Sequence, residues 1–145
     1  MEARLHIEER SVGGIVVLTL SGQLVADYGA RAFTEKVDAL IKAGSLNVVV
    51  NLYDVSYLDS GGVGALVAKF ISLLQRGGAM KLICLSGRAC RVLRTAGLLS
   101  VVPAFESEAA AIASFAARAG TGSAGLRPMA LRENGTGARG ARRRT

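Results

Sequence analysis

The sequence has few of the residues that usually build catalytic and metal centres. Its 145 residues include one histidine, His6, two cysteines, Cys84 and Cys90, and no tryptophan. The cysteines lie six positions apart without a C-x-x-C motif, and one histidine cannot complete a zinc site with them at any usual spacing. We therefore expect no catalytic residues, no metal and no cofactor, and we predict that both thiols are reduced, small core residues.

Long apolar runs and secretion signals are also absent. The longest uncharged stretch, residues 11–26, is interrupted by glycine and polar residues, and a membrane span needs about 18 consecutive apolar residues. The N-terminal MEARLHIEER segment contains no apolar core followed by a small-residue cleavage site. We expect a cytoplasmic protein without a membrane span.

The positive charge of the chain is concentrated at its C-terminus. Residues 1–118 carry 12 basic and 10 acidic side chains, a net charge of +2, whereas residues 119–145 carry six arginines and one glutamate, a net charge of +5. The second segment is rich in glycine and alanine and has no aromatic residue on which a nucleic-acid base could stack. We predict one domain over residues 1–118, a disordered tail over residues 119–145, and no nucleic-acid partner.

Hydrophobic periodicity predicts alternating strands and helices. Apolar residues around Gly13-Gly14 indicate an antiparallel hairpin, and the β-branched run at 46–52 indicates a buried central strand. Amphipathic helices are predicted after caps at Asp27 and Ser86, at 63–74 and from about Glu106 to Arg118, and short strands at 80–85 and near Val101-Val102. The predicted inward face of the helix at 63–74 consists of its apolar residues, Val63, Leu66, Val67, Phe70, Ile71 and Leu74. The order β-β-α-β-α-β-α-β-α is typical of an α/β fold with a mixed, mostly parallel sheet.

Two predicted helices carry ordered charges. On the first helix, Arg31 with Glu35, and Asp38 with Lys42, have the spacing of outward ion pairs. On the third helix, Arg88, Arg91 and Arg94 form a cationic stripe. This stripe suits an acidic protein or a phosphate, although such stripes are usually solvated faces.

The segment Leu58-Asp59-Ser60-Gly61-Gly62-Val63-Gly64 is more polar and richer in glycine than a simple connection requires. It lies between the predicted central strand and a helix, where α/β sheets often place sites and where helix N–H groups favour anions. The alternative is that Asp59 or Ser60 only caps the helix while the glycines permit a tight turn. Ser60 does not fit the G-x-S-x-G hydrolase motif, which requires glycine at the position of Leu58.

This segment resembles the signature of STAS domains of the anti-sigma factor antagonist type. The resemblance covers residues 5 to about 118 and includes Leu20-Ser21-Gly22-Gln23-Leu24, Val48-Val49-Val50-Asn51-Leu52 and Thr95-Ala96-Gly97-Leu98. It implies a small, partly parallel sheet with helices mainly on one face. It also implies a non-enzymatic bacterial protein that binds a serine-kinase-type anti-sigma factor and thereby frees a sigma factor.

The resemblance further implies which residues bind the partner and which residue is phosphorylated. Partner binding is expected through the loop and the exposed side of the second helix, at Asp59, Ser60, Gly61, Gly62, Val63, Gly64, Lys69 and Ser72. The resemblance places the usual phospho-acceptor at Gly61, which has no hydroxyl. We therefore expect that the kinase adds no phosphate to the wild-type chain, and that the protein is either a constitutively binding antagonist or regulated by partner supply. Ser60 is the secondary candidate acceptor, with its Oγ turned inward as a helix cap. The alternatives are a STAS-like accessory subunit of a transport complex and a nucleotide-binding STAS module.

Overall fold

The computed structural model describes residues 5–26, 28–84 and 87–121. The chain divides after Ala111 into two compact units. The first unit contains a five-stranded sheet, three helices and the start of helix α4 (Glu108–Thr121), and the second unit contains the rest of α4. Among the described residues, no helix combines the length and the apolar character that a membrane crossing requires.

The sheet is mixed and mostly parallel, as predicted. It contains β1 (His6–Val12), β2 (Ile15–Leu24), β3 (Asn47–Leu58), β4 (Ala79–Ile83) and β5 (Ala104–Phe105), in the order β1-β2-β3-β4-β5. Strand β1 is antiparallel to β2, and all other neighbours are parallel. The connections contain α1 (Gly29–Lys42), α2 (Ser60–Gln75), α3 (Arg88–Thr95) and a short 3₁₀ helix at Leu98–Ser100.

The opening hairpin is confirmed, and its turn explains the two glycines. Gly13 and Gly14 have φ angles of +55° and +85°. A two-residue turn of this kind requires left-handed backbone at both central positions, which glycine adopts without steric cost. The turn aligns Val12 with Ile15 and sets the register of the whole β1–β2 pair.

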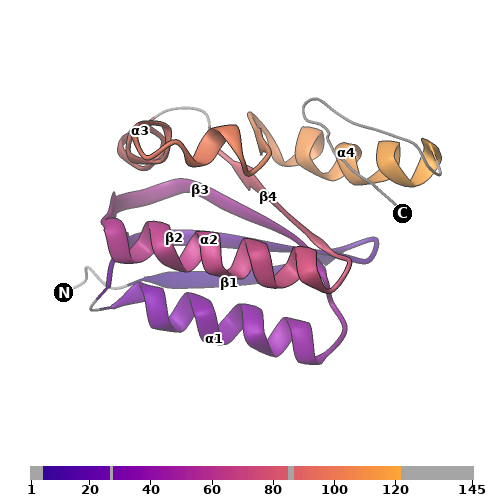
Figure 1. The fold of residues 1–145 in the computed structure, drawn as a ribbon, viewed down its shortest axis with the longest axis horizontal. Helices are drawn as coiled ribbons and strands as arrows, with labels where there is room; N and C mark the ends of the chain where they lie inside the picture. The colour runs from indigo at the N-terminus through magenta and orange to yellow at the C-terminus, as the bar shows by residue number, and fades with distance from the viewer. Residues whose placement is uncertain (1–4, 27, 85–86, 122–145) are drawn as a thin grey trace. The chain divides into compact units, whose positions relative to one another are not determined.

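Helices α1 and α2 lie side by side on one face of the sheet (Figure 1). Phe33 and Val37 of α1 and Leu66 and Leu73 of α2 are fully buried in the core cluster. They meet the apolar residues on that face of the central strands, such as Val50. Phe33 and Val37 are four positions apart, and Leu66, Phe70 and Leu73 follow at intervals of four and three, so helical spacing places them on the inward side of each helix.

The central strand β3 is longer than predicted and continues beyond its pairing with β4. Only Asn47–Asn51 pair with β4, whereas pairing with β2 extends to Leu58. Two register shifts, between Thr19 and Ser21 and between Gly22 and Gln23 on β2, mark β-bulges in this extension. Because each bulge adds one residue to β3, every third side chain is buried there, at Leu52, Val55 and Leu58. Helix α3 packs against β3.

Three local expectations need correction or fall outside the described residues. The strand predicted near Val101-Val102 is wrong, because the chain there follows the 3₁₀ helix and the last strand is β5. The predicted caps Asp27 and Ser86 lie outside the described residues. Helix α4 ends at Thr121, three residues beyond the predicted domain boundary, and residues 122–145 of the predicted tail lie outside the described residues.

The two cysteines are buried in the core, as predicted, but the prediction that they are reduced is wrong. Cys84, directly after β4, and Cys90, on α3, form a disulfide. Their Cα atoms are 5.7 Å apart, which is within the usual range for a disulfide. Sequence spacing gives no information on how closely the end of a strand approaches the first turn of the next helix.

Candidate functional site

Asp59 links the end of β2 to the start of α2. It is the N-cap of α2, and its Oδ1 accepts a 2.9 Å hydrogen bond from the backbone N–H of Gly62. Its two carboxylate oxygens lie 3.1 and 3.2 Å from the backbone nitrogen of Ala26, just beyond β2. The Gly62 N–H, with a further contribution from the Ala26 N–H, stabilises the ionised carboxylate and lowers the pKa of Asp59.

Gly61 and Gly62 allow the start of α2 to approach β2 closely. A Cβ at position 61 would lie 2.4 Å from the Cβ of Ala26, and a Cβ at position 62 would lie 2.1 Å from the carbonyl oxygen of Leu24. Both separations are too short for real side chains. Gly64 differs, because a Cβ there would have no neighbour within 4 Å. The first two glycines are therefore required by packing, whereas Gly64 is not.

Ser60 is the exposed hydroxyl of this loop. It is the first residue of α2, and its side chain is exposed rather than turned inward. The expectation that Ser60 caps the helix is wrong, because Asp59 takes that position. Position 61 faces Ala26 and has no space for a hydroxyl-bearing side chain. The loop thus presents one hydroxyl, at its outer surface.

A cleft of about 530 Å³ opens beside Ser60. One wall is formed by the loop and the first turn of α2, and the other wall is formed by α3. The lining residues are Leu58, Asp59, Ser60 and Val63 on the first wall and Arg91, Val92, Thr95 and Ala96 on the second. Most of this lining surface is apolar, and Arg91 is the one cation among the described lining residues. We call this space the cleft.

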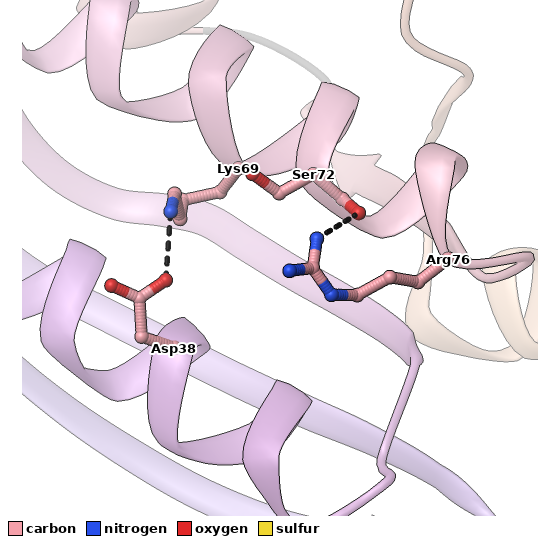
Figure 2. A network of polar contacts seen from close by, with 4 residues as sticks. All are labelled: Asp38, Lys69, Ser72 and Arg76. Atoms are coloured by element: carbon pink, nitrogen blue, oxygen red, sulfur yellow. Dashed lines mark hydrogen bonds and ion pairs between the residues drawn. The ribbon is translucent and has the colours of Figure 1, made fainter.

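Lys69 and Ser72 do not lie on the exposed side of α2, which corrects the expectation from the sequence. Lys69 Nζ forms a 2.7 Å ion pair with Asp38 of α1, and only 13% of the lysine side chain is exposed. One turn further on, the Arg76 guanidinium donates a 3.3 Å hydrogen bond to the backbone carbonyl of Ser72 (Figure 2). These residues line a second groove, between α1 and α2. The predicted pair between Asp38 and Lys42 is wrong, because Asp38 pairs with Lys69 instead. The predicted pair between Arg31 and Glu35 is confirmed, with a separation of 3.2 Å.

The outer surface of α2 is apolar rather than polar. Ile71 and Leu74, expected to point inward, have exposed fractions of 45% and 49%. Val63 and Val67 are half-buried. Because α1 lies on the side of Lys69 and Ser72, helical spacing places these four apolar residues on the opposite flank and outer side of α2. We call Val63, Val67, Ile71 and Leu74 the α2 flank.

Groups that would support metal chemistry are not brought together in the part of the chain that the structure describes. No cluster of three or more His, Cys, Asp or Glu side chains occurs there. His6 is exposed on β1. The site is therefore characterised by a fixed loop, an exposed hydroxyl, an open cleft and an apolar flank.

A family profile for STAS domains matches residues 6–111 of this chain. The matched range contains the loop, α2 and both walls of the cleft, and it covers well over half of the sequence. The chain belongs to the STAS domain family. The resemblance inferred from the loop and the element order is confirmed, together with the fold class.

Two curated relatives of this STAS domain are antagonists of anti-sigma factors. The anti-sigma-B factor antagonist of Bacillus subtilis is 36% identical over 98 residues, which cover 68% of this chain and 88% of that protein. The anti-sigma F factor antagonist of Paenibacillus polymyxa is 24% identical over 108 residues, covering 74% and 92% respectively. An anti-sigma factor antagonist from Mycobacterium paratuberculosis has the same fold, with a TM-score of 0.71 at 19% identity, over 79% of this chain and 96% of that one.

The STAS match ends at the boundary of the first compact unit, so the sheet and the cleft belong to one domain. Sequence reasoning assigned the loop to the site but did not assign Arg91, Val92, Thr95 and Ala96. Two signals pointed to them: the Thr95-Ala96-Gly97-Leu98 motif and the arginine stripe. Neither signal reveals that α3 faces the loop, because a local pattern does not show which distant element a helix packs against.

Proposed function

We propose that this STAS domain acts as an anti-sigma factor antagonist. In this role it is a non-enzymatic, cytoplasmic protein that binds a serine-kinase-type anti-sigma factor and so releases a sigma factor. The similarity to two curated antagonists supports the proposal. The structural observation that carries it is the exposed start of α2, with Ser60 at the surface beside an open cleft.

The geometry of the loop suits recognition by another protein. Asp59 ties the loop to β2 through Ala26, and Gly62 completes the cap, so the backbone is ordered before a partner arrives. A surface that is already ordered loses less conformational entropy on binding. The partner is proposed to contact Asp59, Ser60, Gly61, Gly62, Val63 and Gly64. Lys69 and Ser72 stay proposed partner contacts, although they line the separate groove between α1 and α2.

In place of the expectation that the wild type is not phosphorylated, we propose Ser60 for regulatory phosphorylation, because its side chain is exposed and does not cap the helix. Gly61 offers neither a hydroxyl nor space for one, whereas the Ser60 side chain is exposed. A phosphate adds a charge of about −1.5 to −2. At the N-terminus of α2 the helix dipole tolerates this charge, while the bulk of the phosphate obstructs the partner surface. Phosphorylation would thus prevent binding without unfolding the domain.

Binding is tested with the serine-kinase-type anti-sigma factors of the source organism, purified and titrated by calorimetry. We expect one of them to bind the wild type and the Ser60→Ala variant with similar affinity. The Ser60→Asp variant should bind more weakly, because its carboxylate imitates part of the phosphate charge. If none of these anti-sigma factors binds the folded wild type, the proposed function is wrong.

Phosphorylation is tested by incubating the domain with that kinase and Mg-ATP and measuring the intact mass. We expect the mass of one phosphate on the wild type and none on Ser60→Ala. A circular dichroism spectrum that matches the wild type would show that the variant is folded. A phosphate that persists on Ser60→Ala, or an unmodified wild type, would contradict the assignment of Ser60.

A further inference from the structure

We propose that the cleft and the α2 flank together bind an acidic amphipathic helix of a partner protein. This inference rests on the proposed function, because it uses the same surface, and it adds the chemistry of the partner segment. Three features support it. The first is the apolar α2 flank, and the second is the cationic stripe of Arg88, Arg91 and Arg94 on α3. The third is the positive charge of the C-terminal segment and of a second copy of the chain, the other candidates for covering this surface.

The α2 flank has the spacing that a helical partner recognises. Val63, Val67, Ile71 and Leu74 follow one another at intervals of four, four and three residues. Nearly half of the Ile71 and Leu74 surfaces is exposed, and the small residues Gly64 and Ala68 lie exposed beside them. Helices that bind in grooves insert apolar anchors at this same spacing. An apolar stripe of about three turns is more than isolated surface residues would produce.

The second wall of the site carries the cationic stripe. Arg91 lines the cleft, and Arg88 and Arg94 lie one turn before and after it on α3, with all three side chains exposed. Figure 1 shows α3 at the end of the sheet where α2 begins. A helix in the cleft would therefore meet Val63 of α2 on one side and Arg91 of α3 on the other.

These arginines differ from Arg10, Arg31 and Arg76 in having no partner among the described residues. Arg10 pairs with Glu108, Arg31 pairs with Glu35, and Arg76 donates to a backbone carbonyl. Across the described residues, no ion pair or hydrogen bond engages the side chain of Arg88, Arg91 or Arg94. Three neighbouring guanidinium groups without carboxylates favour an acidic partner, because charge complementarity guides association.

The charge of the chain's own C-terminal segment argues against that segment as the occupant. Residues 122–145 contain six arginines and one glutamate. Such a segment is repelled by the α3 arginines, as is a second copy that presents the same stripe. The partner segment is therefore expected from a different protein, with glutamate or aspartate on one face and leucine-like residues on the other.

The test uses three fluorescent helical peptides of about 18 residues, roughly five turns. The first has leucine at positions that repeat every three or four residues and glutamate on the opposite face. The second replaces each glutamate with lysine, and the third replaces each leucine with serine. Fluorescence anisotropy with the full chain should show that the first peptide binds at least about tenfold more tightly than either of the others.

Variants then locate the binding surface. Arg91→Glu and Ile71→Ser should each weaken binding of the acidic leucine peptide by at least about tenfold. Lys42→Glu is the matched control, because it makes the same charge reversal at an exposed position on α1 and should leave binding unchanged. Thermal denaturation of each variant shows whether it is folded. If Ile71→Ser fails to fold, Leu74→Ser replaces it.

Several results would overturn the inference. Equal binding of the leucine and serine peptides would indicate a general anion surface, and tight binding of the lysine peptide would exclude the charge argument. A concentration-dependent dimer that Ile71→Ser abolishes would assign the flank to a second copy. An anti-sigma factor that binds wild type and Arg91→Glu equally well would refute this inference and leave the proposed function intact. Binding of the acidic leucine peptide without binding of any anti-sigma factor would refute the proposed function and support this inference.

Discussion

Asp59 is the side chain on which the geometry of the site depends most, because it holds both Gly62 and Ala26. Sequence reasoning left two candidates for the helix cap, Asp59 and Ser60, since both residue types are good caps and they are adjacent. The structure selects Asp59, which alone reaches the backbone of Ala26. That contact joins residues 33 positions apart, and local spacing contains no information about it.

The lowered pKa of Asp59 predicts how stability depends on pH. Its folded pKa lies below its value in the unfolded chain, so its contribution is present at neutral pH and is lost as the pH falls below about 4. Asp59→Asn keeps a capping oxygen without titrating, so the stability difference between the two proteins should shrink on acidification. Urea denaturation from pH 7 to pH 3 measures this difference. A difference that is independent of pH would contradict the prediction.

Gly61 and Gly64 provide a matched pair for testing close packing. Gly61→Ala should destabilise the domain by about 1 to 3 kcal/mol, because its Cβ would meet Ala26 at 2.4 Å. Gly64→Ala should stabilise it by about 0.5 to 1 kcal/mol, because alanine is the better helix former and the position is open. Denaturation curves compare the free energies of unfolding. A Gly61→Ala variant as stable as the wild type would show that the loop does not approach β2 this closely.

At the scale of elements, sequence patterns predicted the existence of α2 but not its orientation. Its apolar residues were interpreted as one inward face, which includes Ile71 and Leu74. The helix instead buries Leu66 and Leu73, contacts α1 through Lys69, and leaves Ile71 and Leu74 of the α2 flank exposed. Periodicity alone could not separate these faces, because the helix is apolar around most of its circumference and its neighbour α1 covers only one side.

The extension of β3 was unpredictable for a related reason. Strand prediction relies on alternation with a period of two, and the bulges convert this period to three between Leu52 and Leu58. The strand signal therefore ended at Leu52. This matters for the site, because Leu58 at the end of the extension lines the cleft together with residues of α3.

The disulfide between β4 and α3 is expected to stabilise the wall of the cleft. It joins residues six positions apart, and closing a loop of this size contributes about 2 kcal/mol in the chain-entropy model. Unfolding of the wild type should therefore require less urea in the presence of a thiol reductant. The Cys84→Ser/Cys90→Ser double variant is the control and should respond equally with and without reductant. Wild-type stability that is insensitive to full reduction would contradict the prediction.

At the scale of the whole molecule, the composition of the C-terminal segment leads to a prediction about stability. Residues 122–145 have few bulky apolar side chains, while ordering a residue costs roughly 1 to 2 kcal/mol in entropy. A chain that ends at Thr121 should unfold within about 5 °C of the full chain. Calorimetry of both proteins makes the comparison. A larger decrease in melting temperature would show that the segment contributes to the folded state.

The order of the strands in the sheet is the same as their order along the chain. During synthesis, β1 and β2 can close their hairpin before β3 has left the ribosome, and each later strand joins the edge formed by the strand before it. Among the described strands, none has to be inserted between two earlier ones. The loop at Asp59 is completed when α2 follows β3, whereas the cleft waits for α3. A nascent chain therefore displays its loop before it has a cleft.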